Sequence, residues 1–230
     1  MGVEEACIDE EKSASGRKPA YSVGEEIANT VTHGVGAGLA IAALVILVVF
    51  ASRKGDPWRI VSFSIYGATL VMLYMASTLY HAFPWPKVKE HLRRVDHASI
   101  YLLIAGTYTP CTLVCMRNSW GWTLFGIIWG LALIGVVYKA FFIRHFEGLT
   151  VVLYVAMGWL VVIALKPILA AVPLGGLLWL LGGGLCYTFG VIFYAWDRLP
   201  FNHAVWHLFV LAGSILHFFS LLLFILPDEA

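Results

Sequence analysis

The chain has 230 residues, of which 60% are hydrophobic and 13% are charged, and its formal net charge is +1. Charged residues make up about a quarter of an average soluble domain, so this composition excludes a water-soluble globular protein and indicates an integral membrane protein. Lysine and arginine are spread over short loops rather than gathered on one face, which excludes a nucleic-acid-binding protein. The four cysteines lack the paired spacing of a zinc ribbon or of a secreted disulfide scaffold.

The start of the chain differs in composition from the rest. Among residues 1–22, acidic side chains come first and basic ones follow, with no apolar run between them. A signal peptide begins with basic residues and continues with apolar ones, so this segment is not a signal peptide. We expect residues 1–22 to form a disordered cytoplasmic tail and residues 23–230 to form the transmembrane domain.

The rest of the chain contains seven apolar segments that are long enough to cross a membrane as helices. A helix needs about 20 apolar residues to span a hydrocarbon core of roughly 30 Å. Tryptophans lie near the predicted ends of these segments, where an amphipathic ring prefers the membrane interface. We therefore expect an all-α membrane protein, a seven-transmembrane helix bundle. The predicted spans are residues 27–51, 60–83, 97–116, 122–143, 149–165, a sixth that ends near residue 196, and 203–226.

The distribution of lysine and arginine predicts the orientation, because cytoplasmic loops carry the excess of these residues. If the N-terminus is inside, ten basic residues lie on the inner side and five on the outer side. We therefore expect a cytoplasmic N-terminus and an outside C-terminus. The expected location is the prokaryotic plasma membrane (the inner membrane), which the chain crosses several times.

Ionisable side chains at or near membrane depth are costly, so each one is a candidate for function. His81 ends the second predicted span, one helical turn after Ser77, and Asp96 opens the third. His203 and His207 open the seventh at a spacing of four residues, which places both on one helix face. All of these positions follow an even number of membrane crossings. They therefore lie on the same side of the membrane, whichever orientation the protein has.

Three histidines and an aspartate on one side of the membrane indicate a metal centre. Neutral imidazoles from His81, His203 and His207 would leave one position of a tetrahedral zinc ion open for water, which is typical of catalytic zinc. Asp96 would then be the general base, and Ser77 would orient the aspartate or a neighbouring imidazole. A structural zinc that only joins the spans is the alternative. Taken singly, each histidine could also be a hydrogen-bonded residue of the membrane interface.

Other polar residues are weaker candidates. Glu26, Asn29 and His33 lie at helical spacing at the start of the first span and could line the same cavity. A helix cap and interfacial packing explain them equally well. His217 lies well inside the seventh span, where a hydrogen-bonded core histidine is the simpler interpretation. His97 lies near basic residues and is interpreted as an interface residue.

Four motifs resemble a known family in their order, spacing and position relative to the spans. They are Glu26-x-x-Asn29-x-x-x-His33, Ser77-x-x-x-His81, the run from Asp96 to Pro110, and His203-x-x-x-His207. The chain resembles the hemolysin III branch of the progestin and adipoQ receptor family. The resemblance implies a seven-helix fold with the N-terminus inside, zinc held by the three histidines, and Asp96 close to water on the metal. It also implies kinship with adiponectin receptors and alkaline ceramidases, for which hydrolysis of a lipid amide is the proposed chemistry.

Three functions are open at this point. The first is a zinc-dependent hydrolase that cleaves an amide or ester bond of a membrane lipid or another fatty-acyl substrate. The second is a non-catalytic membrane-homeostasis or lipid-sensing protein with a structural zinc. The third, a pore-forming hemolysin, is disfavoured because no span carries the repeated polar stripe that a water-filled path needs. The sequence does not determine the oligomeric state.

Overall fold

The computed structural model describes residues 21–142 and 147–227, so nearly all of the expected tail lies outside the described residues. The described part is helical and contains no strand. Its elements are α2 (Val23–Lys54), α3 (Pro57–Ala82), α4 (Pro86–Pro110), the π-helical turn η1 (Cys111–Cys115), α5 (Ser119–Phe141), α6 (Glu147–Gly158), the 3-10 turn η2 (Leu160–Ala164), α7 (Leu165–Ala171), α8 (Leu174–Tyr194), α9 (Asn202–Ser220) and the π-helical turn η3 (Leu221–Ile225).

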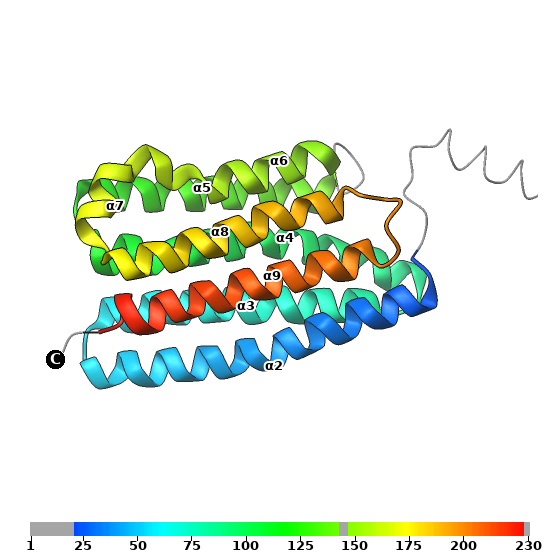
Figure 1. Cartoon of the computed structure of the whole chain (residues 1–230), viewed down its shortest axis with the longest axis horizontal. Helices are drawn as coiled ribbons and strands as arrows, with labels where there is room; N and C mark the ends of the chain where they lie inside the picture. Colours follow the sequence, from blue (N-terminus) through cyan, green and yellow to red (C-terminus); the bar gives the residue numbers. More distant parts are fainter. Residues whose placement is uncertain (1–20, 143–146, 228–230) are drawn as a thin grey trace, which may run out of the picture.

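Seven helical spans in the described part are long and apolar enough to cross a membrane, which confirms the predicted seven-transmembrane helix bundle. The helices lie side by side and roughly parallel (Figure 1). α2 packs against both α3 and α9, so the first and last spans are neighbours. α4 contacts α3, α5 and α6, and α8 packs along α9. The cytoplasmic position of the N-terminus stays a prediction.

Local sequence signals determine where the first helices begin and end. The Ser22 side chain accepts a hydrogen bond from the Glu25 backbone N–H, and the Glu25 side chain accepts one from the Ser22 N–H, which forms a capping box. Gly55 ends α2 with a φ of 70°, a conformation that glycine adopts without steric cost. Asp56 then caps α3, whose first residue is Pro57. Three consecutive residues, Gly55, Asp56 and Pro57, therefore determine the tight turn between α2 and α3.

Two predicted boundaries differ most from the structure. The third span begins at Pro86 rather than near residue 97, because the charged residues 87–94 form the first turns of α4 and extend the helix beyond its apolar part. Proline suits this position, where its missing N–H is not needed. The fifth span continues to Ala171 instead of ending near residue 165. Pro167 is tolerated there because it lies in the first turn of α7.

The fifth span is broken in its middle, where α6 is followed by η2 and α7. In lipid, the backbone groups that such a break releases need partners within the protein. The Tyr108 hydroxyl of α4 lies 3.0 Å from the Met157 carbonyl oxygen and 2.8 Å from that of Gly158. It also accepts a hydrogen bond from the Val161 backbone N–H at 2.9 Å. A single side chain of a neighbouring span thus holds both sides of the break.

Glycines allow α2 and α3 to pack closely. A Cβ atom added at Gly36 of α2 would collide with the Tyr74 ring of α3, and one at Gly67 of α3 would lie 2.9 Å from the Leu44 Cα atom of α2. Lipid tails are as apolar as the side chains, so close packing is a main source of attraction between spans. The result is that α2 lies directly against the part of the bundle that carries the candidate site.

We expect Tyr108→Phe to lower the thermal stability of the protein, because it leaves the backbone groups at the break of the fifth span without their partner. Unpaired buried groups of this kind cost about 1–3 kcal/mol, which thermal unfolding in a neutral detergent will detect. Tyr101→Phe is the matched control, because Tyr101 lies on the same helix and its buried hydroxyl has no hydrogen-bond partner among the described residues. Equal losses of stability in the two variants would contradict this account of the break.

Candidate metal centre

Three histidines converge at the end of the bundle where α2 begins. His81 lies in the last turn of α3, and His203 and His207 lie in the first two turns of α9. One ligand atom from each imidazole lies within 4.8 Å of the others. His81 and His207 are buried, and His203 is half-buried. We call these three residues the histidine group, and we call the end of the bundle where they lie the histidine end.

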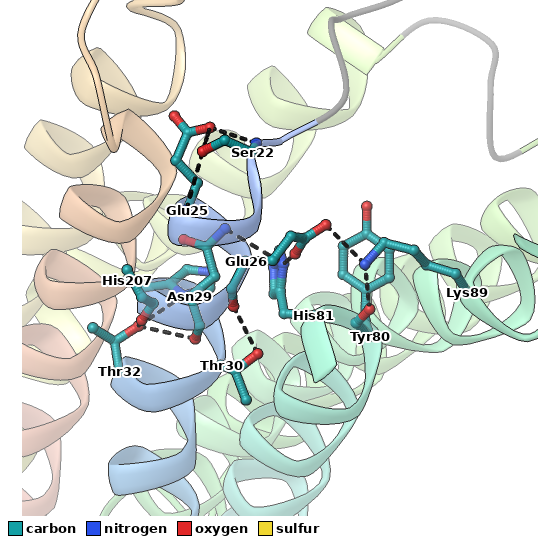
Figure 2. A network of polar contacts seen from close by, with 11 residues as sticks. Ser22, Glu25, Glu26, Asn29, Thr30, Thr32, Tyr80, His81, Lys89 and His207 are labelled. Carbon is teal, nitrogen blue, oxygen red and sulfur yellow. Dashed lines mark hydrogen bonds and ion pairs between the residues drawn. The ribbon is translucent and has the colours of Figure 1, made fainter. Parts of the chain in front are cut away.

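The Glu26 carboxylate of α2 holds the His81 imidazole (Figure 2). Its Oε2 atom lies 2.6 Å from His81 Nδ1, and its Oε1 atom forms an ion pair with Lys89 Nζ at 2.8 Å. Lys89 also donates to the Tyr80 carbonyl oxygen at 2.9 Å, so it is anchored on α3. A carboxylate only accepts hydrogen bonds, so Nδ1 of His81 carries the proton and Nε2 carries a lone pair.

α2 orients His207 in a similar way. The Thr32 hydroxyl lies 3.2 Å from His207 Nδ1 (Figure 2). It also donates to the Ala28 carbonyl oxygen at 2.8 Å. Because the single hydrogen of the hydroxyl points to the backbone, the hydroxyl accepts from the Nδ1–H of His207. Nε2 of His207 therefore also carries a lone pair. Metal-binding histidines commonly use one nitrogen for the metal and donate the other N–H to a partner of this kind.

The histidine group has the chemistry of a metal site. Nε2 of His81 is buried and has no hydrogen-bond partner within the described ranges, so its lone pair is available. Zinc–nitrogen bonds of about 2.0–2.1 Å place two ligands of a tetrahedral site roughly 3.4 Å apart. The ligand atoms of the histidine group lie within 4.8 Å of one another, so small side-chain rotations would bring them to this distance. Neutral imidazoles suit zinc and several other transition metals, so these three residues could hold a metal ion.

Asp96 and Ser77 lie together, as their positions in the predicted spans led us to expect. The Ser77 side chain hydrogen-bonds the Asp96 carboxyl group, and both residues are buried. Ser77 lies one turn before His81 on α3, whereas Asp96 lies on α4. Asp96 is not one of the residues whose ligand atoms form the histidine group. A carboxyl group in this place can accept a proton from a molecule in the space beside it.

That space is an elongated cavity of about 170 Å³, lined at the histidine end by Asp96, His203 and His207. Along α4 its lining extends from Asp96 to Tyr108, which is roughly 18 Å at 1.5 Å per residue. Away from the histidine end, side chains such as Leu103 make most of the lining apolar. A long apolar cavity with polar groups at one end matches an acyl chain that carries a polar head.

The connection before α9 determines where His203 enters the site. Phe201 has a φ of 58°, a left-handed conformation that is strained for a residue with a side chain. Its backbone N–H donates to the Glu25 carboxylate at 3.2 Å, so the first turn of α2 holds this connection in place. The Tyr21 ring packs against His203 with ring centroids 5.0 Å apart. Burial raises the pKa of the Tyr21 hydroxyl, which therefore stays neutral beside the histidine.

The weaker candidates at the start of the first span also lie in or beside the site. Glu26 and Asn29 both face His81 Nδ1, with the Asn29 amide nitrogen 3.4 Å away, and neither caps the helix. His33 stacks on His207 with ring centroids 3.5 Å apart, and it lines the cavity. His33 therefore lines the cavity, as one of the two interpretations left open by the sequence expected, whereas Glu26 and Asn29 contact His81 and are not among the residues that line the cavity.

Three more residues of the cavity wall were read differently or missed in the sequence. His217 donates to the Leu180 carbonyl oxygen at 3.1 Å, as expected for a core histidine, and it lines the cavity as well. His97 lines the cavity instead of facing the interface. Lys139 was missed, although it is the only charged residue in the predicted span 122–143. It is fully buried and lines the cavity.

Known proteins resemble this chain over almost its whole length. Residues 21–218 match the family described as Haemolysin-III related. Hemolysin-3 of Bacillus cereus is 49% identical over 208 residues, which cover 90% of this chain and 95% of the relative. The Hemolysin-3 homolog of Bacillus subtilis (strain 168) is 47% identical over 204 residues, covering 89% and 96%. The Monocyte to macrophage differentiation factor of Homo sapiens is 30% identical over 208 residues, covering 86% and 83%.

The matched residues include the histidine group, Asp96 and Ser77. Together with the seven helical spans, the bacterial relatives identify a multi-pass protein of the bacterial cell membrane. The chain belongs to the haemolysin-III related family of membrane proteins.

Proposed function

We propose that this protein is a zinc-dependent hydrolase that cleaves an amide or ester bond of a membrane lipid. The observation that carries the proposal is the cavity, in which two members of the histidine group and the hydrogen-bonded pair of Ser77 and Asp96 meet an apolar wall. A metal that only joins helices needs neither a carboxyl group beside it nor a cavity of acyl length. Both features are what a lipid hydrolase needs.

Each group has a role in this proposal. The three imidazoles hold the zinc ion, which when bound supplies a Lewis acid that polarises a carbonyl group and makes water more acidic. Asp96 accepts the proton of the attacking water and passes it to the leaving nitrogen or oxygen of the substrate. Ser77 donates a hydrogen bond to the Asp96 carboxylate and fixes its direction. The apolar wall of the cavity binds the acyl chain and excludes bulk water.

A second function, lipid sensing with a structural zinc, is supported by a different observation. The histidine group joins helices that are far apart in the chain, because His81 belongs to α3 and the other two histidines to α9. Glu26 and Thr32 connect the same imidazoles to α2. A metal in this position would lock three spans together without catalysing a reaction. Turnover of a lipid by the purified protein separates the two functions.

Pore formation is the third candidate function, and it is suggested by the name Hemolysin-3 of the relative from Bacillus cereus. The cavity argues against it, because its lining is mostly apolar and its charged groups lie at the histidine end. A water-filled path needs polar groups along its whole length. Ion flux through liposomes that disappears when zinc is removed would favour the pore over the hydrolase.

Purified wild-type protein is expected to contain about one zinc ion per chain, because three imidazoles leave one coordination position open and hold the ion with the other three. His203→Ala is expected to lose most of it, as measured by mass spectrometry of the metal in detergent without a chelator. His91→Ala is the control, since His91 is exposed on α4 and is not part of the histidine group. Wild-type protein without zinc, or His203→Ala with a full complement, would contradict the site.

Asp96→Asn is expected to keep its zinc and to lose turnover of lipid amides or esters by about 10²- to 10⁴-fold, the usual contribution of a general base. Zinc content and hydrolysis are measured on the same preparation, after wild-type protein has been used to identify a cleaved lipid. Ser77→Ala is expected to lose less, because it leaves the carboxylate in place. Wild-type turnover in Asp96→Asn would remove Asp96 as the base.

Glu26→Gln is expected to lower the affinity for zinc by about 10- to 100-fold, because an amide holds the Nδ1–H of His81 more weakly than a carboxylate does. Competition with a chromophoric chelator measures this affinity. Glu90→Gln is the control, since Glu90 of α4 forms an ion pair with Arg94 of the same helix α4 and is not part of the histidine group. An affinity equal to that of the wild type would show that the contact between Glu26 and His81 does not support the metal.

A further inference from the structure

Lys139 occupies an unusual place for a lysine in a membrane-spanning helix. It lies near the end of α5, and its relative exposure is 0%. Val137 and Phe141, two residues away on either side, are 56% and 76% exposed, so Lys139 is on the face of α5 that points into the bundle. A lysine near a helix end ordinarily extends its ammonium group to the membrane interface. A lysine that remains inside is costly, which makes it a candidate for binding.

The cavity is what Lys139 faces. Lys139 lines it together with Asp96, and within the described residues these two are its only lysine, arginine or acidic residues. Lys139 and His97, the residue that follows Asp96 on α4, both line this cavity. The Asp96 carboxyl group is itself engaged by the Ser77 hydroxyl and by the charge of Arg93. The α5 side of the cavity therefore contributes one lysine side chain at the histidine end.

An ammonium group in this position is suited to an anion. It has three N–H donors and no acceptor, so it can contact the protein and a bound ligand at the same time. Charge-assisted hydrogen bonds are about twice as strong as neutral ones, and the exclusion of water strengthens them further. Thr150, which is buried at the start of α6, lines the same cavity and adds a hydroxyl group.

We infer that the cavity binds a single-chain lipid with an anionic head, a phosphate or a carboxylate, and that Lys139 selects this lipid by contacting the head. The acyl chain extends from the histidine end along α4 toward Leu103 and Ile104, where the lining is apolar. The inference deepens the proposed function, since it names the class of substrate, and it rests on that function only for the cleavage that follows binding. Binding itself needs no turnover.

A structural role for Lys139 is the competing explanation. A cation near the C-terminal end of a helix stabilises the helix dipole, and α5 ends two residues later. Such a role would make the protein less stable when the charge is removed, but it would not change which lipid head the protein prefers. The preference among heads is therefore the decisive measurement.

The experiment compares three lipids that share an oleoyl chain and differ in their heads: lysophosphatidic acid, oleate and mono-oleoylglycerol. Purified protein in a neutral detergent is incubated with equal amounts of the three, and the lipid retained per chain is measured by native mass spectrometry. Wild-type protein is expected to retain the anionic lipids in preference to the neutral one, and the better retained of the two identifies the anion. Lys139→Met is expected to reduce this preference by about tenfold or more, the scale of one charge-assisted hydrogen bond. Lys139→Arg is expected to keep much of it.

Lys87→Met is the matched control, because Lys87 is exposed at the start of α4, and it is expected to behave like the wild type. Lys139→Gln replaces Lys139→Met if the latter does not fold. His203→Ala shows whether a metal, rather than Lys139, provides the preference. A wild type that does not prefer anionic lipids, or a preference that survives without the Lys139 charge, would overturn the inference. Failure of the hydrolase would be seen separately, as bound lysophosphatidic acid whose ester bond is never cleaved.

Discussion

The contact between Glu26 and His81 is the interaction on which the site depends. It fixes the position of the proton on the imidazole, and with it the nitrogen that α3 presents to α9. Placing a charged carboxylate beside a buried histidine costs desolvation energy. Two features offset this cost: the carboxylate is 20% exposed to solvent, and it forms an ion pair with Lys89. Without this pairing the lone pair of His81 would not have a defined direction.

α2 has the same function for the rest of the histidine group, although it contributes no member of that group itself. Thr32 orients His207, and Glu25 holds the strained connection at Phe201 that leads into α9. One helix thus positions imidazoles from two others, which explains the polar residues in its first three turns. A close fit of α2 against α3 follows, and the glycine at position 36 makes room for it.

The cavity and the break in the fifth span are related. Irregular backbone is tolerated at membrane depth only where it is buried in protein or lines a cavity. Gly158 and Trp159, at the end of α6, line the cavity, and Tyr108 of the neighbouring helix α4 forms the hydrogen bonds that hold the break. The space that would accept an acyl chain is therefore bordered by the part of the bundle in which the helical pattern is interrupted.

Much of this could be predicted from the sequence. Apolar length alone located the seven spans, and counting membrane crossings placed His81, Asp96 and the two histidines of the last span on one side. Hydropathy could not locate the start of α4, because a helix can continue through charged residues outside the membrane.

Contacts between helices were the part that the sequence did not reveal. Spacing within the first span could not distinguish a cap from a contact with His81, since the partner lies 55 residues away. The break in the fifth span depends on Tyr108 of another helix, so its own sequence carries no sufficient signal. Lys139 did carry a signal, as a single charge in an apolar span, and only the structure shows that it faces the cavity.

X-ray absorption spectroscopy at the zinc edge, on protein purified without a chelator, tests the central claim most directly. The account predicts four-coordinate zinc with three imidazole nitrogens and one exchangeable oxygen ligand, at distances of about 2.0–2.1 Å. It also predicts that this signal disappears when the histidine group is disrupted. A sulfur ligand, a closed site with four imidazoles, or the absence of zinc from well-folded protein would contradict it.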